Sequence, residues 1–296
     1  SRHPGKVITY VSDAISVAPA PLRLWQTLWS GKLFAVKTAR TLELSARGEA
    51  MEMGHTLPVL SNCVVPRAIV DTIVEQFGDL CISTTADSCF AYRFCALYDD
   101  YLHFDRALAI LYGSHRSAGL GYLKGEGGDF ADYLRTWHGD TWLDAAPIPG
   151  VNLGYNMLFH EYELVRRSPA GKRLPPLDRE GYLRDLARGL VFVEDDQQRE
   201  KLRRLLEEHG WKGELPAYTP AEPRSGRWRR VVRTLRQRAA LFTAARFDRQ
   251  PRSISGFAFR SDEEALHYAL RFPRQPAADA EHLSLVEPVE VGMAAP

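Results

Sequence analysis

Segments typical of β-strands alternate with segments typical of amphipathic helices along the first 112 residues of the chain. Residues 6–18 are rich in β-branched and apolar side chains and are followed by Pro19, which predicts a strand. A helix is predicted from Pro66 to Phe77, because proline suits the first helical turn and apolar residues then recur at helical spacing. Gly78 is the expected end of that helix.

The alternation continues beyond this helix. A second helix is predicted over 87–98, and further strand-like segments are 57–65, 101–104 and 108–112. Residues 151–166 and 178–209 have the pattern of helices. This order predicts an α/β protein, with a sheet flanked by helices and followed by a mainly helical C-terminal region.

Charge and cysteine content argue against several classes of protein. The 296 residues carry 38 Lys+Arg and 37 Asp+Glu, a formal net charge of +1, whereas a nucleic-acid-binding chain is normally far more basic. No apolar run is long enough to predict a membrane-spanning helix, and no targeting segment is visible. The 4 cysteines form no C-x-x-C pair, which disfavours a zinc site and favours reduced thiols in a cytoplasmic protein. Cys89 and Cys95 lie near aromatic residues and are expected to be buried.

Two segments carry residue types suited to chemistry. In residues 83–93, Ser-Thr-Thr-Ala-Asp-Ser-Cys-Phe-Ala-Tyr-Arg, Asp87 stands at the head of the predicted helix. It is either an acid that stabilises the helix start or an exposed general base. Arg93 either pairs with another acid or binds substrate. Residues 113–117 form a Gly-Ser-His-Arg-Ser turn, whose imidazole, guanidinium and hydroxyl groups suit contact with an oxyanion or a phosphate.

These segments resemble the second half of bacterial family-two glycosyltransferases, in the same order and at similar spacing. The matching segments are 57–67, 83–93, 100–110 and 113–119. The resemblance covers residues 6–124. It implies part of a glycosyltransferase A-type fold and transfer of a sugar from a nucleotide-sugar donor to a glycan or lipid-linked acceptor.

The resemblance also implies roles for individual residues. Asp87 matches the catalytic base that deprotonates the acceptor hydroxyl. His115 matches a residue that completes metal coordination or touches the donor diphosphate. Arg116 would neutralise charge on the leaving group, and Ser117 would donate a hydrogen bond. The remaining candidates for substrate binding are Arg93, Trp137 and Trp142, of which the tryptophans either stack on an acceptor sugar or belong to core and loops.

The sequence departs from the family pattern in three places. Many relatives carry an acidic pair where this chain has Ala86-Asp87, and proline is usual where Ala107 stands. The family's nucleotide-binding half, with its Asp-x-Asp metal motif, is not found, so the chain is expected to begin just after that motif. A divalent metal, Mg or Mn, is still expected by resemblance. We therefore expect the isolated chain to transfer no nucleotide sugar.

The expected organisation follows from the resemblance and from shifts in composition. The units are an acceptor-side α/β half (1–125), a loop and helical extension (126–212), a linker (213–226), a basic amphipathic helical region (227–272) and a disordered tail (273–296). Residues 224–249 hold nine arginines and one acid. This segment either makes peripheral contact with an anionic membrane or packs its apolar face on the main domain; no nucleic acid is expected as a partner.

Two classes of function remain open. The first is a glycosyltransferase, or part of one, that acts on a nucleotide sugar and a glycan acceptor. The alternative is a non-catalytic binding or scaffold protein that retains a truncated glycosyltransferase fold, which the missing metal motif favours. An unrelated hydrolase is less favoured, because no G-x-S-x-G nucleophile motif occurs.

Overall fold

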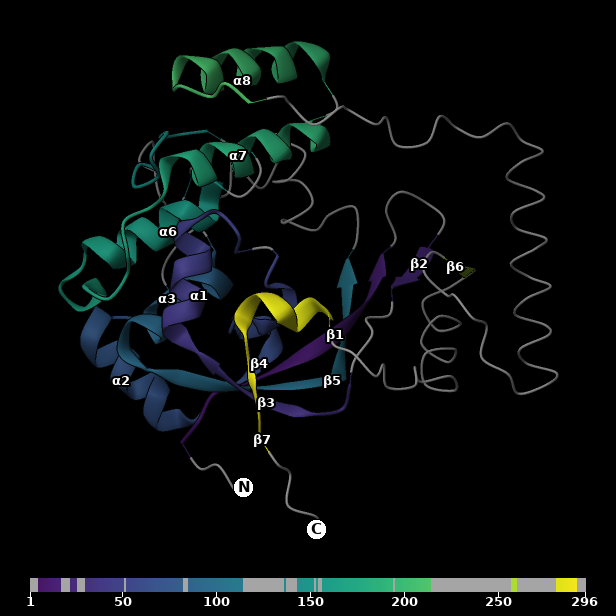
Figure 1. The fold of residues 1–296 in the computed structure, drawn as a ribbon, viewed down its shortest axis with the longest axis vertical. Coiled ribbons are helices and arrows are strands. Elements are labelled where there is room, and N and C mark those ends of the chain that lie inside the picture. The colour runs from purple at the N-terminus through teal and green to yellow at the C-terminus, as the bar shows by residue number, and fades with distance from the viewer. Residues whose placement is uncertain are drawn as a thin grey trace.

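A computed structural model of the protein gives the arrangement of the chain (Figure 1). The described residues are 5–16, 22–25, 30–50, 52–81, 85–113, 136, 143–151, 153, 156–193, 195–213, 257–259 and 281–291. Predictions that concern other residues lie outside this part of the chain. They include the linker from residue 214 onward and the arginine-rich segment 224–249.

The strands form one mixed sheet. Its order is β6-β2-β1-β5-β3-β7, and β4 pairs with β1 beside this path. The strands are β1 (Ile8–Ser16), β2 (Leu22–Trp25), β3 (Leu33–Lys37), β4 (Cys63–Val64), β5 (Asp100–Gly113), β6 (Phe257–Phe259) and β7 (Val289–Val291). β1 and β5 run parallel, and the other recorded pairings are antiparallel. The prediction of an α/β protein with a mixed sheet is confirmed.

The central strand β5 is longer than its sequence pattern indicates. Two strand-like segments were expected, over 101–104 and 108–112, but Asp100–Gly113 is one continuous strand. Its register against β1 shifts between two consecutive residues of β1. Tyr10 pairs with Phe104, whereas Val11 pairs with Ala107. The extra residues of β5 are accommodated as a bulge, which interrupts the alternation of side chains without ending the strand.

Three helices connect the strands of the first half. They are α1 (Thr38–Ala46), α2 (Arg67–Phe77) and α3 (Ala86–Leu97). The predicted boundaries of α2 are confirmed, because Pro66 precedes its first turn and Gly78 ends it in the left-handed conformation at φ 85°. Gly78 donates its N–H to the carbonyl oxygen of Val74 at 2.8 Å.

Helix α3 lies at the centre of the larger hydrophobic core. Its buried side chains include Phe90, Tyr92, Phe94 and Cys95, and the same core takes in Tyr101 of β5. The Phe94 and Tyr101 rings meet edge to face, with centroids 6.1 Å apart. Such packing on the sheet holds α3 as a rigid element. The expected burial of Cys89 and Cys95 is confirmed, at 1% and 0% exposed.

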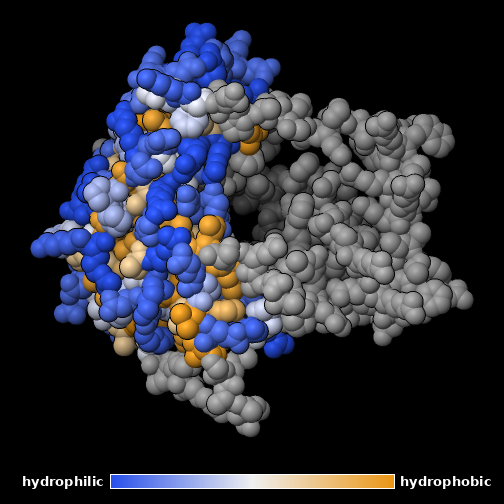
Figure 2. Space-filling model, in the orientation of Figure 1, coloured by the Kyte–Doolittle hydropathy of each residue, from blue (hydrophilic) through white to orange (hydrophobic). Residues whose placement is uncertain are grey.

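The helical region that follows contains α6 (Asn156–Arg167), α7 (Arg179–Gly189) and α8 (Asp196–Glu208). A single helical segment was predicted over 178–209, but a short 3-10 turn at Leu190–Phe192 separates α7 from α8. Asp195 begins α8 by accepting a hydrogen bond from the Gln198 N–H at 2.7 Å. In Figure 1 these helices follow one another away from the sheet, and Figure 2 shows hydrophilic side chains covering α8 at the top.

The C-terminal segments correct two predictions. Residues 273–296 were expected to be disordered, yet 281–286 form a 3-10 helix and β7 pairs with β3. Residues 281–291 are held to the rest of the protein, because Leu283 and Val286 are 2% and 1% exposed and because Arg40 donates to the Leu285 carbonyl at 2.9 Å. The region 227–272 was expected to be helical, but Phe257–Phe259 form β6, an edge strand of the same sheet.

Candidate functional site

Asp87 is an exposed carboxylate in the first turn of the buried helix α3. The residue that precedes the helix in extended conformation is Thr85, and its side chain makes no capping hydrogen bond. Asp87 therefore lies near free backbone N–H groups, where the helix dipole favours a negative charge. Its exposure leaves the carboxylate accessible to a ligand.

A second carboxylate reaches the same end of α3 from another helix. Glu161 of α6 is fully buried, and its Oε1 accepts hydrogen bonds from the N–H of Thr85 at 3.1 Å and from its hydroxyl at 3.4 Å. This contact ties the start of α3 to α6. Sequence reasoning missed Glu161, although an acid between His160 and Tyr162 on the apolar face of a predicted helix is a usable signal.

Cys63 of β4 is a residue of the sheet whose thiol responds to the charge of Asp87. Burial, with a smaller contribution from the charge of Asp87, raises the pKa of the Cys63 thiol to about 12. The thiol is protonated at neutral pH and is therefore a poor nucleophile. Cys63 pairs in register with Thr9 of β1, so the side chains of these two residues lie on the same face of the sheet.

A line of buried polar side chains continues from Thr9 across β5. The Thr9 hydroxyl lies 2.8 Å from Nδ1 of His103, and Nε2 of His103 lies 3.8 Å from Oδ1 of Asp105. Oδ2 of Asp105 accepts a hydrogen bond from the Ser30 N–H at 2.7 Å. Thr9, His103 and Asp105 are each 0% exposed. These groups hold one another in position, because buried polar atoms need partners.

The site combines an exposed acid with a set of buried polar side chains on the sheet. The charge of Asp87 acts on the Cys63 thiol, Cys63 pairs with Thr9, and Thr9 contacts His103. An exposed carboxylate on a rigid helix is suited to accepting a proton from a bound hydroxyl. The buried groups behind it are suited to positioning and not to direct contact with a ligand.

Arg93, a candidate for substrate binding, pairs with an acid in the structure. Its guanidinium forms an ion pair with Asp79, donates to the Asp79 carbonyl oxygen at 2.6 Å and lies 5.2 Å from the centre of the Phe77 ring. Only 12% of the side chain is exposed. Of the two interpretations of the sequence, pairing with another acid is the one that the structure supports, and Arg93 links α3 to the end of α2.

Replacement of Arg93 by methionine is expected to lower the free energy of unfolding by about 1–3 kcal/mol, because the ion pair between Arg93 and the partly buried carboxylate of Asp79 is lost. The matched control is Arg67→Met. Arg67 also pairs with an acid, Asp71, but its side chain is 86% exposed, so a loss of at most about 0.5 kcal/mol is expected. Urea denaturation measures both variants, and equal losses would contradict the structural role of Arg93.

The remaining site predictions fall outside the described residues. These are His115, Arg116, Ser117, Trp137 and Trp142. The structure therefore gives no geometry that joins Asp87 to them. Among the residues it does describe, no three His, Cys, Asp or Glu side chains come together as metal ligands, and no reaction step is assigned to the expected Mg or Mn ion.

Two further observations complete the description. No helix in the described ranges is both long and apolar enough to cross a membrane. The described cysteines Cys63, Cys81, Cys89 and Cys95 are free thiols.

Comparison with known proteins adds no relative, because no family model, no curated protein and no solved structure matches the chain.

Proposed function

We propose that this chain is the acceptor-side part of a family-two glycosyltransferase, with part of a glycosyltransferase A-type fold. The observation that carries the proposal is the position of Asp87. Its carboxylate is exposed at the first turn of a helix of which eight residues, Ser88–Tyr92 and Phe94–Ala96, are buried. The resemblance of residues 83–93 to the family's catalytic segment selects this acid from the other exposed acids of the surface.

In the proposed reaction Asp87 accepts the proton of an acceptor hydroxyl. The hydroxyl oxygen then forms a bond to the anomeric carbon of the donor sugar, and the bond from that carbon to the nucleoside diphosphate breaks. Proton transfer of this kind requires the base to lie within hydrogen-bond reach of the hydroxyl. The packing of α3 and the contact between Thr85 and Glu161 keep the Asp87 backbone in place for this purpose.

Other parts of the proposal rest on the resemblance alone. His115, Arg116 and Ser117 would contact the donor diphosphate, and Trp137 and Trp142 would contact the acceptor. A Mg or Mn ion would neutralise the leaving diphosphate. We also propose a cytoplasmic location, with peripheral contact to an anionic membrane through residues 224–249.

A second candidate is a non-catalytic binding or scaffold protein that retains the truncated fold. The absence of an Asp-x-Asp motif from the sequence favours it. The two candidates differ in what Asp87 does. A transferase needs the Asp87 carboxylate for turnover. In a binding protein this carboxylate contributes at most to the affinity for the ligand.

The test is sugar transfer from a panel of radiolabelled nucleotide sugars to a membrane and glycan extract, using the gene product purified from its native cells. Asp87→Asn is expected to lower the rate at least about 100-fold, because general-base catalysis typically contributes that much. The control is Asp71→Asn, which changes an exposed acid of α2 whose side chain is 57% exposed.

The outcomes separate the candidates. Loss of transfer in Asp87→Asn with retention in Asp71→Asn supports the proposal. If the unmodified gene product binds glycan but transfers no sugar, this result supports the scaffold candidate. The 296-residue chain alone is expected to transfer nothing, and clear turnover by it would contradict its assignment as an acceptor-side part.

A further inference from the structure

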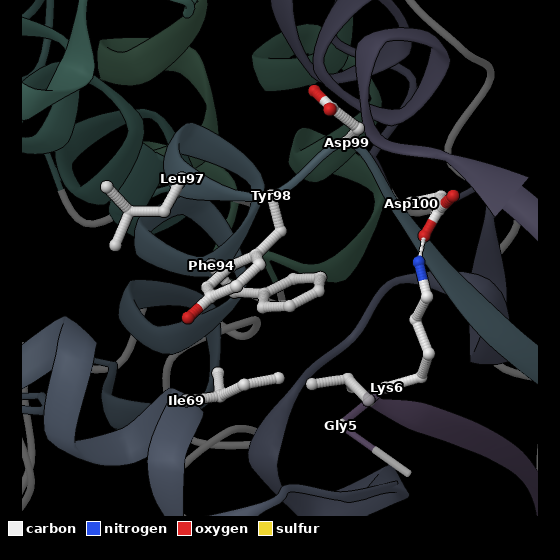
Figure 3. Close-up of a pocket in the computed structure, with 9 residues that line it drawn as sticks. Gly5, Lys6, Ile69, Phe94, Leu97, Tyr98, Asp99 and Asp100 are labelled. Carbon is white, nitrogen blue, oxygen red and sulfur yellow. Dashed lines mark hydrogen bonds and ion pairs between the residues drawn. The ribbon is translucent and has the colours of Figure 1, made fainter. Parts of the chain in front are cut away.

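A pocket of about 250 Å³ opens at the opposite end of α3 from Asp87 (Figure 3). It lies where α3 ends and β1 and β5 begin, with α2 alongside. At 1.5 Å per residue along the helix axis, Asp87 is about 10 Å from Phe94 and about 16 Å from Tyr98, both of which line the pocket. The pocket is thus distinct from the candidate active site.

One side of the pocket is aromatic and apolar. The Phe94 and Tyr98 rings stack with centroids 5.1 Å apart and an angle of 15° between their planes. Figure 3 shows the two rings together, with Ile69 below them. Phe94 is 1% exposed and belongs to the core, whereas Tyr98 is only half-buried. Tyr98 therefore presents an aromatic surface to a ligand.

The facing side carries a donor and an acceptor together. Lys6 forms an ion pair with Asp100, and Figure 3 shows this pair across from the aromatic rings. The side chains of Lys6 and Asp100 are 46% and 28% exposed, so both reach solvent. Lys37 lies 3.7 Å from the same carboxylate. An ammonium offers donors, and a carboxylate offers acceptors.

The charged groups at the pocket already have partners of opposite sign, which disfavours a charged ligand. An anion would face the carboxylates of Asp99 and Asp100. A cationic ligand would compete with Lys6 and Lys37 for Asp100, and with Arg173, which binds Asp99 at 2.6 Å. A neutral ligand with several hydroxyl groups is not repelled by the carboxylates and does not compete with the cations for them. Its hydroxyls can accept from the ammonium and donate to the carboxylate.

We propose that this pocket binds a single neutral pyranose ring. One face of such a ring consists of C–H groups, which would pack on the exposed side of Tyr98. Adjacent hydroxyls on the ring edge would then bridge Lys6 and Asp100. Pockets for drug-sized ligands begin at roughly 300 Å³, so a volume of 250 Å³ suits one sugar ring and not a nucleotide.

The site does not depend on the proposed transferase activity. It would hold a saccharide away from the reacting atoms, as a separate contact to a glycan or a glycosylated partner. The variant Asp87→Asn is accordingly expected to bind pyranosides as the unmodified chain does. Loss of binding in Asp87→Asn would place the ligand at the candidate active site and overturn the assignment to this pocket.

Saturation-transfer difference NMR on the full chain tests the proposal. The probes are the methyl glycosides of β-D-glucopyranose, β-D-galactopyranose and α-D-mannopyranose, with choline and glucuronate as charged comparisons. At least one neutral glycoside is expected to bind with a Kd on the order of 1 mM. In labelled protein, it should shift the signals of Ile69 and Tyr98.

Matched variants identify the contacts. Lys6→Met keeps the aliphatic stem but removes the ammonium, and is expected to weaken binding about tenfold. Lys32→Met is the control, because Lys32 is 49% exposed and also pairs with a carboxylate, that of Glu290, but lies outside the pocket. Tyr98→Leu should abolish binding. The proposal is overturned by no binding of any neutral glycoside, by tighter binding of choline or glucuronate, or by equal effects of the two lysine variants.

Discussion

Replacement of Asp185 by asparagine is expected to stabilise the protein at pH 8 by about 2–4 kcal/mol, and to have little effect at pH 4. Asp185 lies on α7 and is 4% exposed. Burial and, to a smaller extent, the negative charge of Glu52 raise the pKa of its carboxyl to about 7, against the opposing effects of Arg188 and Arg184. Above neutral pH, the folded protein must therefore hold a poorly solvated negative charge, which asparagine lacks.

The direction of the pH dependence follows from proton binding. The ordinary pKa of 3.8 applies to the unfolded chain, so the folded protein binds the proton more tightly. Between about pH 4 and pH 7 the folded state carries more protons, and the contribution of this group to stability falls as pH rises. Above about pH 7 the Asp185 carboxyl is ionised in both the folded and the unfolded state, and its contribution to the free energy of unfolding falls no further.

Urea denaturation at pH 4 and pH 8 measures the effect, with Asp71→Asn as the control. Asp71 is 57% exposed and has a surface partner, so its replacement should change stability little at either pH. The gain in Asp185→Asn should be large at pH 8 and absent at pH 4. An equal change at both values, or a loss of stability at pH 8, would contradict the assignment.

The local signals in the sequence were sufficient for some elements. Helix α2 begins after Pro66 and ends at Gly78, as predicted. Both signals are local, because the fixed φ of proline and the left-handed conformation of glycine determine the backbone only of neighbouring residues. The position of Asp87 at the start of α3 was predictable because apolar residues begin to recur at helical spacing there. Strand β7 was not, because it pairs with β3, more than two hundred residues earlier, and its three residues carry little pattern of their own.

The buried parts of the candidate site depend on contacts between distant segments. His103 and Thr9 come from strands far apart in the chain, and their contact follows from the parallel pairing of β1 and β5. Glu161 reaches Thr85 only because α6 packs on α3. Arg93 was open to two interpretations, because its partner Asp79 lies in the preceding loop. Residue type suggested what these groups can do, and tertiary packing decided which partners they contact.

Replacement of Gly48 by alanine is expected to destabilise the protein by about 3 kcal/mol or more. Gly48 has a φ of 74°, and an added Cβ would lie 2.5 Å from the Gly181 carbonyl oxygen, which belongs to the backbone of α7. Neither backbone can yield easily, because Asp178 donates its N–H to the Ala46 carbonyl at 2.8 Å beside this contact. The turn after α1 and the start of α7 would have to separate.

Gly78→Ala provides the matched control. Gly78 has a φ of 85° and open space around the position of an added Cβ, so it carries the backbone strain without the clash and should cost about 1–2 kcal/mol. Urea denaturation measures the loss of unfolding free energy in both variants, and the difference between them is the cost of the clash at Gly48. Equal losses in the two variants would contradict the predicted clash. The Gly48 variant has a second expected signature. Asp185 lies against the same turn, so separation of α1 from α7 should hydrate its carboxyl, lower its pKa toward the ordinary value and reduce the difference in stability between pH 4 and pH 8.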